Sequence, residues 1–528
     1  MNNRDPNPKP PNNISDQEQE GAPWELPWYQ VPFFRRLFTA VFPPLGLWLI
    51  WANPERTRRQ KITGTALTLL YIPVYLACVL AMLNLAGIVD FEFRGGFGPS
   101  IVRRKTLPNY VLLEMHRPEK RKPAAPALPQ DDRARPTYWT DFRGPRRDGV
   151  YDEQPILTNW PAKGPRLLWK QPIGGGYASF AVAEGRAFTI EQRYDQEVVT
   201  AYDIETGHEL WSHSYPAFFK EWMGGDGPRA TPTYHAGLLY SMGAMGDLKC
   251  LAAASGKLLW QKNVLSDNNS SNLTYGMANS PLVVDEKLIV LTGRETNGRG
   301  VVAYHKLTGD RIWSALDDRQ AYVTPLLTTL AGRRQILVVT SKRAVGLSPE
   351  NGELLWEYPW TVQNNNMISM PVIVGTNKFF ISAGYGAGCA LVEIVEKDGR
   401  FMARQVWRNR NMRNKFNASV LYDNHIYGLD EGVLACIDVT TGKTRWRDGR
   451  YGYGQLLLAS GHLIVLGGEG ELALVRASPD RRHEVARINA LSGKTWNVPA
   501  LSQGLLLVRN CAEMACYDLR PPRPKTAR

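Results

Sequence analysis

Side chains suited to molecular recognition gather in five loops of the C-terminal part of this chain. These loops are rich in asparagine, arginine and tyrosine. An amide offers a donor and an acceptor, a guanidinium offers a planar fork, and a phenol offers a stacking face with a hydroxyl. Such a mixture is typical of surfaces that bind polar partners. The loops comprise residues 219–229, 267–275, 363–366, 408–417 and 450–455.

We predict that these loops and their neighbours form one binding face. Loops held by a rigid scaffold are where binding residues usually lie. The alternative is that Asn and Gly here only satisfy the backbone of turns. The candidate residues of the face are Trp222, Arg229, Asn272, Tyr275, Asn279, Tyr322, Asn366, Arg413, Lys415, Asn417 and Tyr453.

The elements that position these loops are indicated by a recurring sequence motif, a turn that contains glycine and is followed by a tryptophan. A period of roughly 40 to 50 residues with a turn and an aromatic residue indicates a propeller blade or another repeat array. Weaker copies end at Trp169 and Trp407. The clear copies are Thr206–Trp211, Ser255–Trp260, Thr308–Trp313, Asn351–Trp356 and Thr441–Trp446.

One repeat, residues 231–263, divides into four short apolar or alternating runs separated by turns. Four antiparallel strands of this length make one propeller blade. The glycine of the recurring turn suits a residue at positive φ, and Asp203 and Asp438 precede the turn in two copies, where a carboxylate can accept from the loop backbone. We expect each repeat tryptophan to wedge between neighbouring blades, with its indole N–H bonded to a partner.

The fold class that follows is an all-β propeller, with eight four-stranded blades expected and seven as the alternative. The outer strand of one late blade falls at 485–488 or at 493–496, and the spacing after Trp446 favours the former. The last strands, 504–508 and 514–517, then need a partner. Residues 167–170 can supply it, and that closure would remove the open sheet edges.

The repeats resemble the pyrroloquinoline-quinone-type family, whose motif is a strand, Asp-x-x-Thr-Gly-Lys, two residues and Trp. Residues 139–149, Trp-Thr-Asp-Phe-Arg-Gly-Pro-Arg-Arg-Asp-Gly, resemble the segment that opens many bacterial propellers of this kind. The resemblance covers residues 137–520 and implies the propeller fold. Some members are quinone-dependent dehydrogenases, and others, such as the propeller lipoprotein of outer-membrane protein assembly, bind proteins without a cofactor.

Three features speak against the dehydrogenase interpretation. The propeller leaves little room for the insertions that build a cofactor cavity, and the adjacent-cysteine disulfide of many alcohol-oxidising members is absent. Hydride transfer to a quinone also requires a general base and a divalent cation. The loops hold few acids, so we predict no catalytic, cofactor-binding or metal-ligating residue; the acids are Glu221, Asp226, Asp267, Asp317 and Asp318.

The net charge of +13 is scattered, and neither zinc spacing nor a nucleic-acid-binding signature accompanies it, so nucleic-acid binding is not predicted. Six cysteines occur. Cys78 lies in an apolar stretch, and Cys250, Cys389 and Cys436 fit buried strand positions. Cys511 and Cys516 either form a disulfide or remain free thiols, and the sequence leaves both alternatives open.

The N-terminal region contains a candidate membrane anchor. No charge occurs between Lys61 and Asp90, so we expect a transmembrane helix over 63–89. Residues 37–52 carry Pro43-Pro44 and form either a first helix or a re-entrant element. The loop with Arg56, Arg58, Arg59 and Lys61 is basic and therefore expected in the cytoplasm, which places the propeller on the periplasmic side.

The sequence thus predicts a propeller hung from the bacterial inner membrane, without a signal peptide or a lipid-anchor cysteine. We expect it to bind protein partners in the cell envelope, without enzymatic activity, cofactor, metal or nucleic acid. The alternative is a quinone-dependent membrane dehydrogenase that oxidises an alcohol or sugar and uses calcium. The expected parts are a disordered tail (1–33), a membrane segment (34–90), a Pro-rich charged linker (91–136), the propeller (137–520) and a basic tail (521–528).

Overall fold

A computed structural model describes residues 31–96, 98–120, 138–292 and 299–522 of the chain. The predicted disordered tail and basic tail fall almost wholly outside these residues. The chain divides into two compact units, residues 1–91 with 101–104, and residues 92–100 with 105–528. Each unit is described by itself.

The N-terminal unit contains three helices. Helices α1 (Pro32–Val41) and α2 (Pro43–Ala52) are separated at Phe42, which has φ −142° and ψ 80°. Phe42 precedes the proline pair, and a residue before proline is pushed out of the helical region. Each helix of ten residues spans about 15 Å, about half the hydrocarbon core of a bilayer. Residues 37–52, expected as one element, are therefore broken in two.

Helix α3 (Arg58–Leu85) is long and apolar enough to cross a membrane, and it is the one such helix among the described residues. It starts earlier than the predicted 63–89, because Thr57 and Gln60 form a capping box. Within the unit, the Tyr71 and Tyr75 hydroxyls donate to the carbonyls of Ala40 and Val41 at 3.0 and 2.7 Å. These bonds satisfy acceptors that the end of α1 leaves open.

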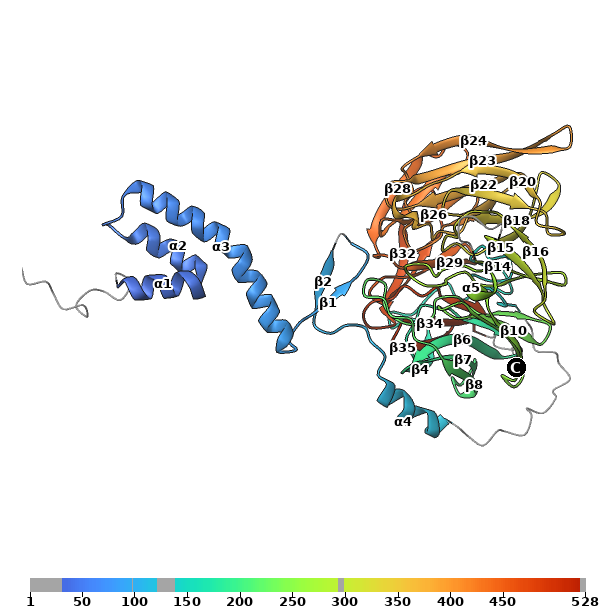
Figure 1. Cartoon of the computed structure of the whole chain (residues 1–528), viewed down its shortest axis with the longest axis horizontal. Coiled ribbons are helices and arrows are strands. Elements are labelled where there is room, and N and C mark those ends of the chain that lie inside the picture. The colour runs from blue at the N-terminus through green and yellow to red at the C-terminus, as the bar shows by residue number, and fades with distance from the viewer. Residues whose placement is uncertain (1–30, 97, 121–137, 293–298, 523–528) are drawn as a thin grey trace, which may run out of the picture. The chain divides into compact units, whose positions relative to one another are not determined.

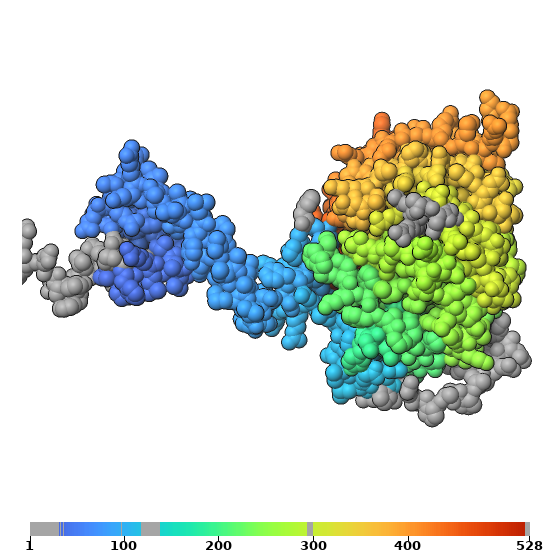
Figure 2. Space-filling view, in the orientation of Figure 1, coloured from blue at the N-terminus to red at the C-terminus, as the bar shows by residue number. Residues whose placement is uncertain are grey.

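The larger unit is a propeller of eight blades (Figure 1), as the repeat count predicts. Each blade is an antiparallel sheet of four strands, and one blade gains a fifth short strand. Successive blades lie against one another in the space-filling view (Figure 2). The first six sheets are β5 (Ala181–Ala183), β6 (Arg186–Arg193), β7 (Gln196–Asp203) and β8 (Glu209–Pro216); β9 (Thr233–His235), β10 (Leu238–Met242), β11 (Asp247–Ala252) and β12 (Leu258–Asn263); β13 (Leu282–Val284), β14 (Lys287–Leu291), β15 (Val301–His305) and β16 (Arg311–Ala315); β17 (Leu326–Leu330), β18 (Arg333–Val339), β19 (Arg343–Leu347) and β20 (Leu354–Pro359); β21 (Val372–Val374), β22 (Lys378–Ala383), β23 (Gly388–Lys397) and β24 (Arg400–Asn409); and β25 (Val420–Tyr422), β26 (His425–Asp430), β27 (Val433–Asp438) and β28 (Thr444–Arg450).

The last two sheets close the ring with strands from the start of the propeller. Strand β4 (Arg166–Pro172) becomes the outermost strand of the final sheet, with Trp169 opposite Cys516. The short β3 (Val150–Tyr151) pairs in parallel with β29. Both the predicted closure and the favoured outer strand near 485–488 are confirmed. These sheets contain β29 (Gln455–Ala459), β30 (His462–Leu466), β31 (Glu471–Arg476) and β32 (His483–Asn489), and then β33 (Ala500–Ser502), β34 (Leu505–Arg509) and β35 (Glu513–Asp518).

The recurring tryptophan packs against the turn of the next blade. The Trp211 indole donates to the Ala253 carbonyl, and the Trp260 indole donates to the Lys306 carbonyl, both at 3.0 Å. The same rings cover the turn glycines of the following repeats, Gly256 and Gly309. A Cβ built on Gly309 would lie 2.9 Å from the Trp260 ring, so a side chain there would collide with it. The glycine therefore serves both the positive φ of the turn and the approach of the ring.

The segment with the family-like lead-in sequence runs across the inner ends of the blades. Its backbone bonds two inner strands, since the Trp139 and Thr140 carbonyls accept from Val182 and Tyr234 at 2.7 and 2.9 Å. Arg147 pairs with Asp141 at 2.8 Å and donates to the carbonyls of Pro281 and Pro325, which precede β13 and β17. Arg147 is 2% exposed, and its bonds supply the partners that a buried guanidinium requires.

The predicted linker, residues 91–136, is structured in its first part, so that expectation is wrong there. It contains β1 (Asp90–Phe93) and β2 (Pro99–Val102), which form a two-stranded sheet, and α4 (Tyr110–Lys120). The Asn109 side chain caps α4 by accepting from the Leu112 amide at 3.0 Å. Leu113 is buried, and Arg117 pairs with Glu209 of β8 at 2.9 Å. The charged residues of this stretch thus attach α4 to the propeller.

All six cysteines are free, and Cys511 and Cys516 are buried but unpaired. Cys250, Cys389 and Cys436 lie in β11, β23 and β27 with 0% of each side chain exposed. They fill the sheets as small apolar residues, as predicted.

The contribution of the tryptophan–glycine contact to the free energy of unfolding can be measured with two glycines of one blade. Gly256 and Gly237 have φ of +71° and +80°, but only Gly256 lies under a tryptophan; nothing lies within 4 Å of a Cβ at Gly237. Replacing either by alanine costs roughly 1–2 kcal/mol in backbone strain. Gly256→Ala should lose about 1–3 kcal/mol more, because the new methyl group overpacks the Trp211 ring. Urea denaturation followed by tryptophan fluorescence measures both, and equal losses would contradict the docking.

Candidate binding cavity in the propeller channel

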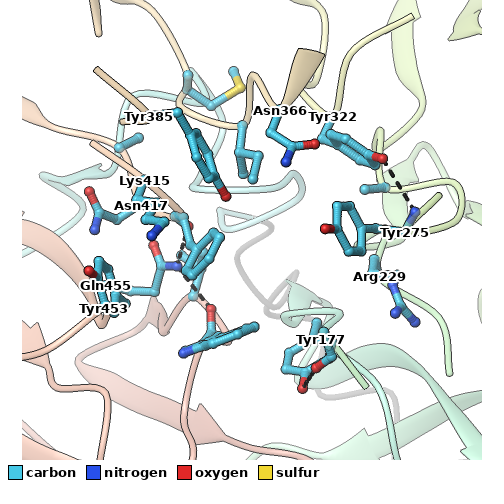
Figure 3. A pocket seen from close by; sticks show the side chains of 18 of the residues that line it. Tyr177, Arg229, Tyr275, Tyr322, Asn366, Tyr385, Lys415, Asn417, Tyr453 and Gln455 are labelled. Atoms are coloured by element: carbon cyan, nitrogen blue, oxygen red, sulfur yellow. Dashed lines mark hydrogen bonds between the residues drawn. The ribbon is translucent and has the colours of Figure 1, made fainter. Parts of the chain in front are cut away.

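A cavity of about 920 Å³ lies where the loops that lead into the inner strands meet. Its lining includes residues from every blade or from the loop that leads into it, and Figure 3 shows ten of these residues around the cavity, labelled. Phe142 and Arg143 of the lead-in segment line it, and so do the turns between β22 and β23 and between β26 and β27, with Tyr385 and Glu431. The predicted gathering of these loops on one face is what the propeller topology produces.

Aromatic rings make up a large share of the cavity wall. Burial raises the pKa of Tyr322 and of Tyr453 to about 12, so both phenols stay protonated at neutral pH and can donate. The Tyr453 hydroxyl donates to Glu431 at 3.1 Å. Flat faces with protonated hydroxyls suit stacking against, and hydrogen bonding to, a polar partner. The lining rings are Phe93, Phe142, Tyr177, Tyr275, Tyr322, Tyr385, Phe416, Tyr453 and Trp496.

The charged side chains of the cavity wall are mostly cationic. Arg143, Arg229, Arg413 and Lys415 line the cavity, and Glu431 is the only carboxylate among its described lining residues. Arg413 is neutralised by Asp430 at 2.7 Å. Burial lowers the pKa of Arg143 to about 10, which still leaves it charged at neutral pH. The cavity therefore favours ligands rich in acceptor atoms.

Two buried donors of the wall lack partners among the described residues. They are Nε of Arg143 and Nδ2 of Asn417. Arg143 otherwise donates only to carbonyls, at 3.3–3.4 Å to Asp148, Ser419 and Leu456. A buried donor without a partner is costly, but both atoms are closed off from the cavity, so a ligand does not reach them in this arrangement.

Lys415 sits among rings rather than beside a carboxylate. Its Nζ donates to the Gly95 carbonyl at 2.6 Å. It also lies 5.0 Å from the Tyr385 ring centroid and 4.9 Å from that of Tyr453, within the range of cation–π attraction. Burial lowers the pKa of Lys415, and Glu431 partly opposes this shift.

The structure brings most of the predicted face residues to this cavity. Arg229, Tyr275, Tyr322, Asn366, Arg413, Lys415, Asn417 and Tyr453 line it. Whether they bind a ligand stays a prediction.

Three of the predicted residues do not line the cavity. Trp222 is 80% exposed. The Asn272 amide donates to the Ala244 carbonyl at 2.9 Å. The Asn279 amide donates to the carbonyls of Ala321 and Val323, so it joins two blades. These asparagines satisfy backbone groups, as the alternative interpretation of the loops holds.

Other lining residues were missed by the sequence analysis. Tyr177 comes from the Gly-rich stretch before β5, and Tyr385 from a turn between strands of one blade. Trp496 resembled a degenerate repeat tryptophan, but it lies in the loop between β32 and β33 and stacks on Phe416 with centroids 4.6 Å apart. Its position after the outer strand of its blade was the signal that could have placed it.

The lining offers few ligands for the calcium that accompanies the quinone in the dehydrogenase members. Calcium takes six to eight oxygen ligands, several of them carboxylates. Here one carboxylate, Glu431, faces four cationic side chains and accepts from Tyr453. No cluster of three or more His, Cys, Asp or Glu side chains suited to a metal occurs in the described parts of the chain.

Comparison with known proteins agrees with this repeat type. The family model described as outer membrane protein assembly factor BamB matches residues 195–448. BamB of Burkholderia pseudomallei (strain K96243) is 24% identical over 339 residues, covering 62% of this chain and 75% of that protein.

Two solved structures are similar to this chain. BamB from Moraxella catarrhalis has 14% identity and a TM-score of 0.47, covering 68% of this chain and 100% of that one. The quinohemoprotein alcohol dehydrogenase from Comamonas testosteroni has 13% identity and a TM-score of 0.50, covering 75% of this chain and 83% of that one. At such identity this likeness shows the fold alone. The propeller of this chain is thus built from repeats of the pyrroloquinoline-quinone type, and its residues 195–448 match the model of BamB.

Proposed function

We propose that this protein is a membrane-anchored, extracytoplasmic propeller that binds a protein partner in the cell envelope and acts there as a scaffold without catalysis. The observation that carries the proposal is the make-up of the channel cavity. It combines nine aromatic rings, four cationic side chains and several amides with a single carboxylate. This set recognises acceptor-rich, partly aromatic surfaces such as polypeptide.

Catalysis finds little support in the same cavity. A general base must reach the proton it removes and have a matching pKa. Glu431, the single carboxylate among the described lining residues, already accepts from the Tyr453 hydroxyl at 3.1 Å. The resemblance to BamB, whose name describes an assembly factor, adds support for a binding role.

The N-terminal unit supports anchoring in the inner membrane. Helix α3 has 28 residues, or roughly 42 Å of length, more than the 30 Å hydrocarbon core requires. The basic residues before and at its start, among them Arg56 and Lys61, favour a cytoplasmic start. The chain after α3 would then be extracytoplasmic.

The orientation can be tested by cysteine labelling in spheroplasts. The five propeller cysteines are buried, so Cys78→Ser leaves a background without an exposed thiol. In that background, Asp480→Cys on an exposed propeller loop should react with a membrane-impermeant maleimide in intact spheroplasts. Its matched control, Glu55→Cys, should react only after permeabilisation. The reverse pattern would overturn the orientation.

Partner binding can be tested by photo-crosslinking at two exposed aromatic positions. Trp222, 80% exposed, belongs to the loop that supplies Met223 and Gly224 to the cavity wall. Tyr422, 39% exposed, ends an inner strand away from those loops. A photoreactive phenylalanine at position 222 should trap an envelope protein several-fold more than one at position 422. Equal or absent crosslinks at both would contradict binding at this face.

Absence of the quinone cofactor is a separate expectation. Pyrroloquinoline quinone and calcium, added together to the detergent-solubilised chain, should neither raise its melting temperature nor support dye-linked oxidation of alcohols or sugars. A quinoprotein dehydrogenase serves as the positive control. A thermal shift that requires both components would return the dehydrogenase interpretation.

A further inference from the structure

The mouth of the cavity is occupied by residues of this same chain. We call residues 92–96 the mouth segment; it belongs to the same compact unit as the propeller. Phe93 and Gly96 of this segment line the cavity. The Phe93 ring meets the Trp496 ring edge to face, with centroids 6.4 Å apart and an interplanar angle of 89°. An aromatic residue at this position therefore has a preformed partner ring.

The second contact of the mouth segment requires a glycine, at position 95. Gly95 has φ +87°, and a Cβ built on it would lie 2.5 Å from Cδ2 of Tyr453 and 2.8 Å from Cε2 of Phe416. Its carbonyl accepts from Lys415 Nζ at 2.6 Å. Lys415 is held in place by the rings around it. Any larger residue would push the backbone away from this lysine.

Between these two contacts lies an arginine. Arg94 pairs with Glu469, in the turn between β30 and β31, and with Glu92 at 2.9 Å. Glu469 is half exposed, and such pairs contribute little affinity, about 0–1 kcal/mol. They favour a basic residue at this point and so fix the register of the segment.

The three contacts come from separate blades and loops, so the propeller itself presents an ordered series of subsites. From the structure we propose that the channel mouth is a peptide-binding site for an extended aromatic–arginine–glycine segment of a partner protein, and that the mouth segment is its occupant in cis. This inference rests on the proposed binding function and names the chemistry of the partner. A matching partner segment replaces the mouth segment and makes the same contacts.

The cavity beneath the mouth explains how a partner can win this competition. A tethered occupant acts at an effective concentration in the millimolar range, so a free peptide with only the same contacts is excluded. A partner segment is not tied back into the β1–β2 hairpin. It can continue along the cavity wall, where the exposed amide side chains of Gln363 and Asn364 lie. Its backbone carbonyl oxygens can accept from these amides.

The test uses variants of the full-length chain in detergent in which the mouth segment cannot occupy the site. The measured quantity is their affinity for a labelled peptide of residues 90–96, Asp-Phe-Glu-Phe-Arg-Gly-Gly. Gly95→Val cannot seat the mouth segment. Gly98→Val is the matched control, because nothing lies within 4 Å of a Cβ at Gly98. Gly95→Val should bind the peptide at least about tenfold more tightly than wild type or Gly98→Val, since the tethered competitor is gone. Equal affinities in the three proteins would overturn the proposal.

A second variant that displaces the mouth segment and a second peptide test whether binding is specific to these subsites. Arg94→Glu places like charges against Glu469 and Glu92 and should loosen the mouth segment by a smaller amount than Gly95→Val, which gives a second test if Gly95→Val fails to fold. A peptide with valine at its first glycine should not bind either opened variant, whereas Lys415→Met in the Gly95→Val background should lose the parent peptide. If the valine peptide bound as tightly as the parent peptide, the proposal of a subsite that requires glycine would be wrong.

Two further outcomes separate this inference from the proposed function. If Gly95→Val binds no peptide while position 222 still crosslinks an envelope protein, the scaffold role stands and the mouth site falls. If the wild type is a dimer by light scattering and Gly95→Val is a monomer, the occupant is a second copy of this chain. That result would overturn the assignment to a partner protein.

Discussion

The packing of a tryptophan on the turn glycine of the next blade, found at five of the eight blade junctions, is the contact on which this propeller depends. Trp169 covers Gly207, Trp211 covers Gly256, and the series continues with Trp260 on Gly309, Trp313 on Gly352 and Trp407 on Gly442. The indole N–H of each ring except that of Trp313 lies 3.0 Å from a carbonyl of the following blade, and that of Trp313 lies 3.3 Å away. At these five junctions the contact points to the next repeat, so it orders the blades around the ring; Trp356 departs from the pattern, since its indole donates to Gln335 of its own blade. The contact needs the bare backbone of glycine, and this explains why the turn and the tryptophan recur together in the sequence.

A ring of such contacts is stable only if it closes, and two elements from before the first blade provide the closure. Strand β4 completes the last sheet as its fourth strand and covers the edge of β35. The lead-in segment fixes the inner ends, with Arg147 bonded to carbonyls ahead of β13 and β17 and Arg143 bonded to the Ser419 carbonyl ahead of β25 and the Leu456 carbonyl within β29. Hydrogen bonds also join the inner ends of neighbouring blades. The backbone amides of Ser179, Thr231 and Ser280 each donate to a side-chain hydroxyl of the next blade, at 2.9–3.1 Å. The cavity wall is thus held from below and from all sides, which keeps its side chains preorganised.

The sequence predicts this architecture well because its signals are local. Turn, tryptophan and alternating strand lie within one repeat, so the number of blades and the closing strand follow from spacing. The site is predicted less completely, because its residues meet only when the ring has formed. Tyr385 sits in a turn inside a blade, and Trp496 stands where a repeat tryptophan would be expected. Asn272 and Asn279 show the opposite error, since the same amide that can recognise a ligand here satisfies backbone carbonyls. The hairpin of β1 and β2 and the helix α4 have no repeat signal, and the charge and proline content of their surroundings concealed them.

The mouth segment also gives a physical reason why the anchor and the channel belong to one chain. Only residues 86–89 separate the end of α3 from the start of β1, whose last residue, Phe93, lies at the cavity. On the other side, α4 is attached to the propeller by Leu113 and by the Arg117–Glu209 pair. A ligand that displaces residues 92–96 must therefore move chain that is fixed at one end to the propeller and continues at the other into the candidate membrane span. Under the proposed function, binding in the channel and the length of free chain beside the candidate membrane span are then coupled by covalent connection. A propeller whose channel were left open would bind the same partner without this link, so the glycine at position 95 serves the coupling as much as the fit.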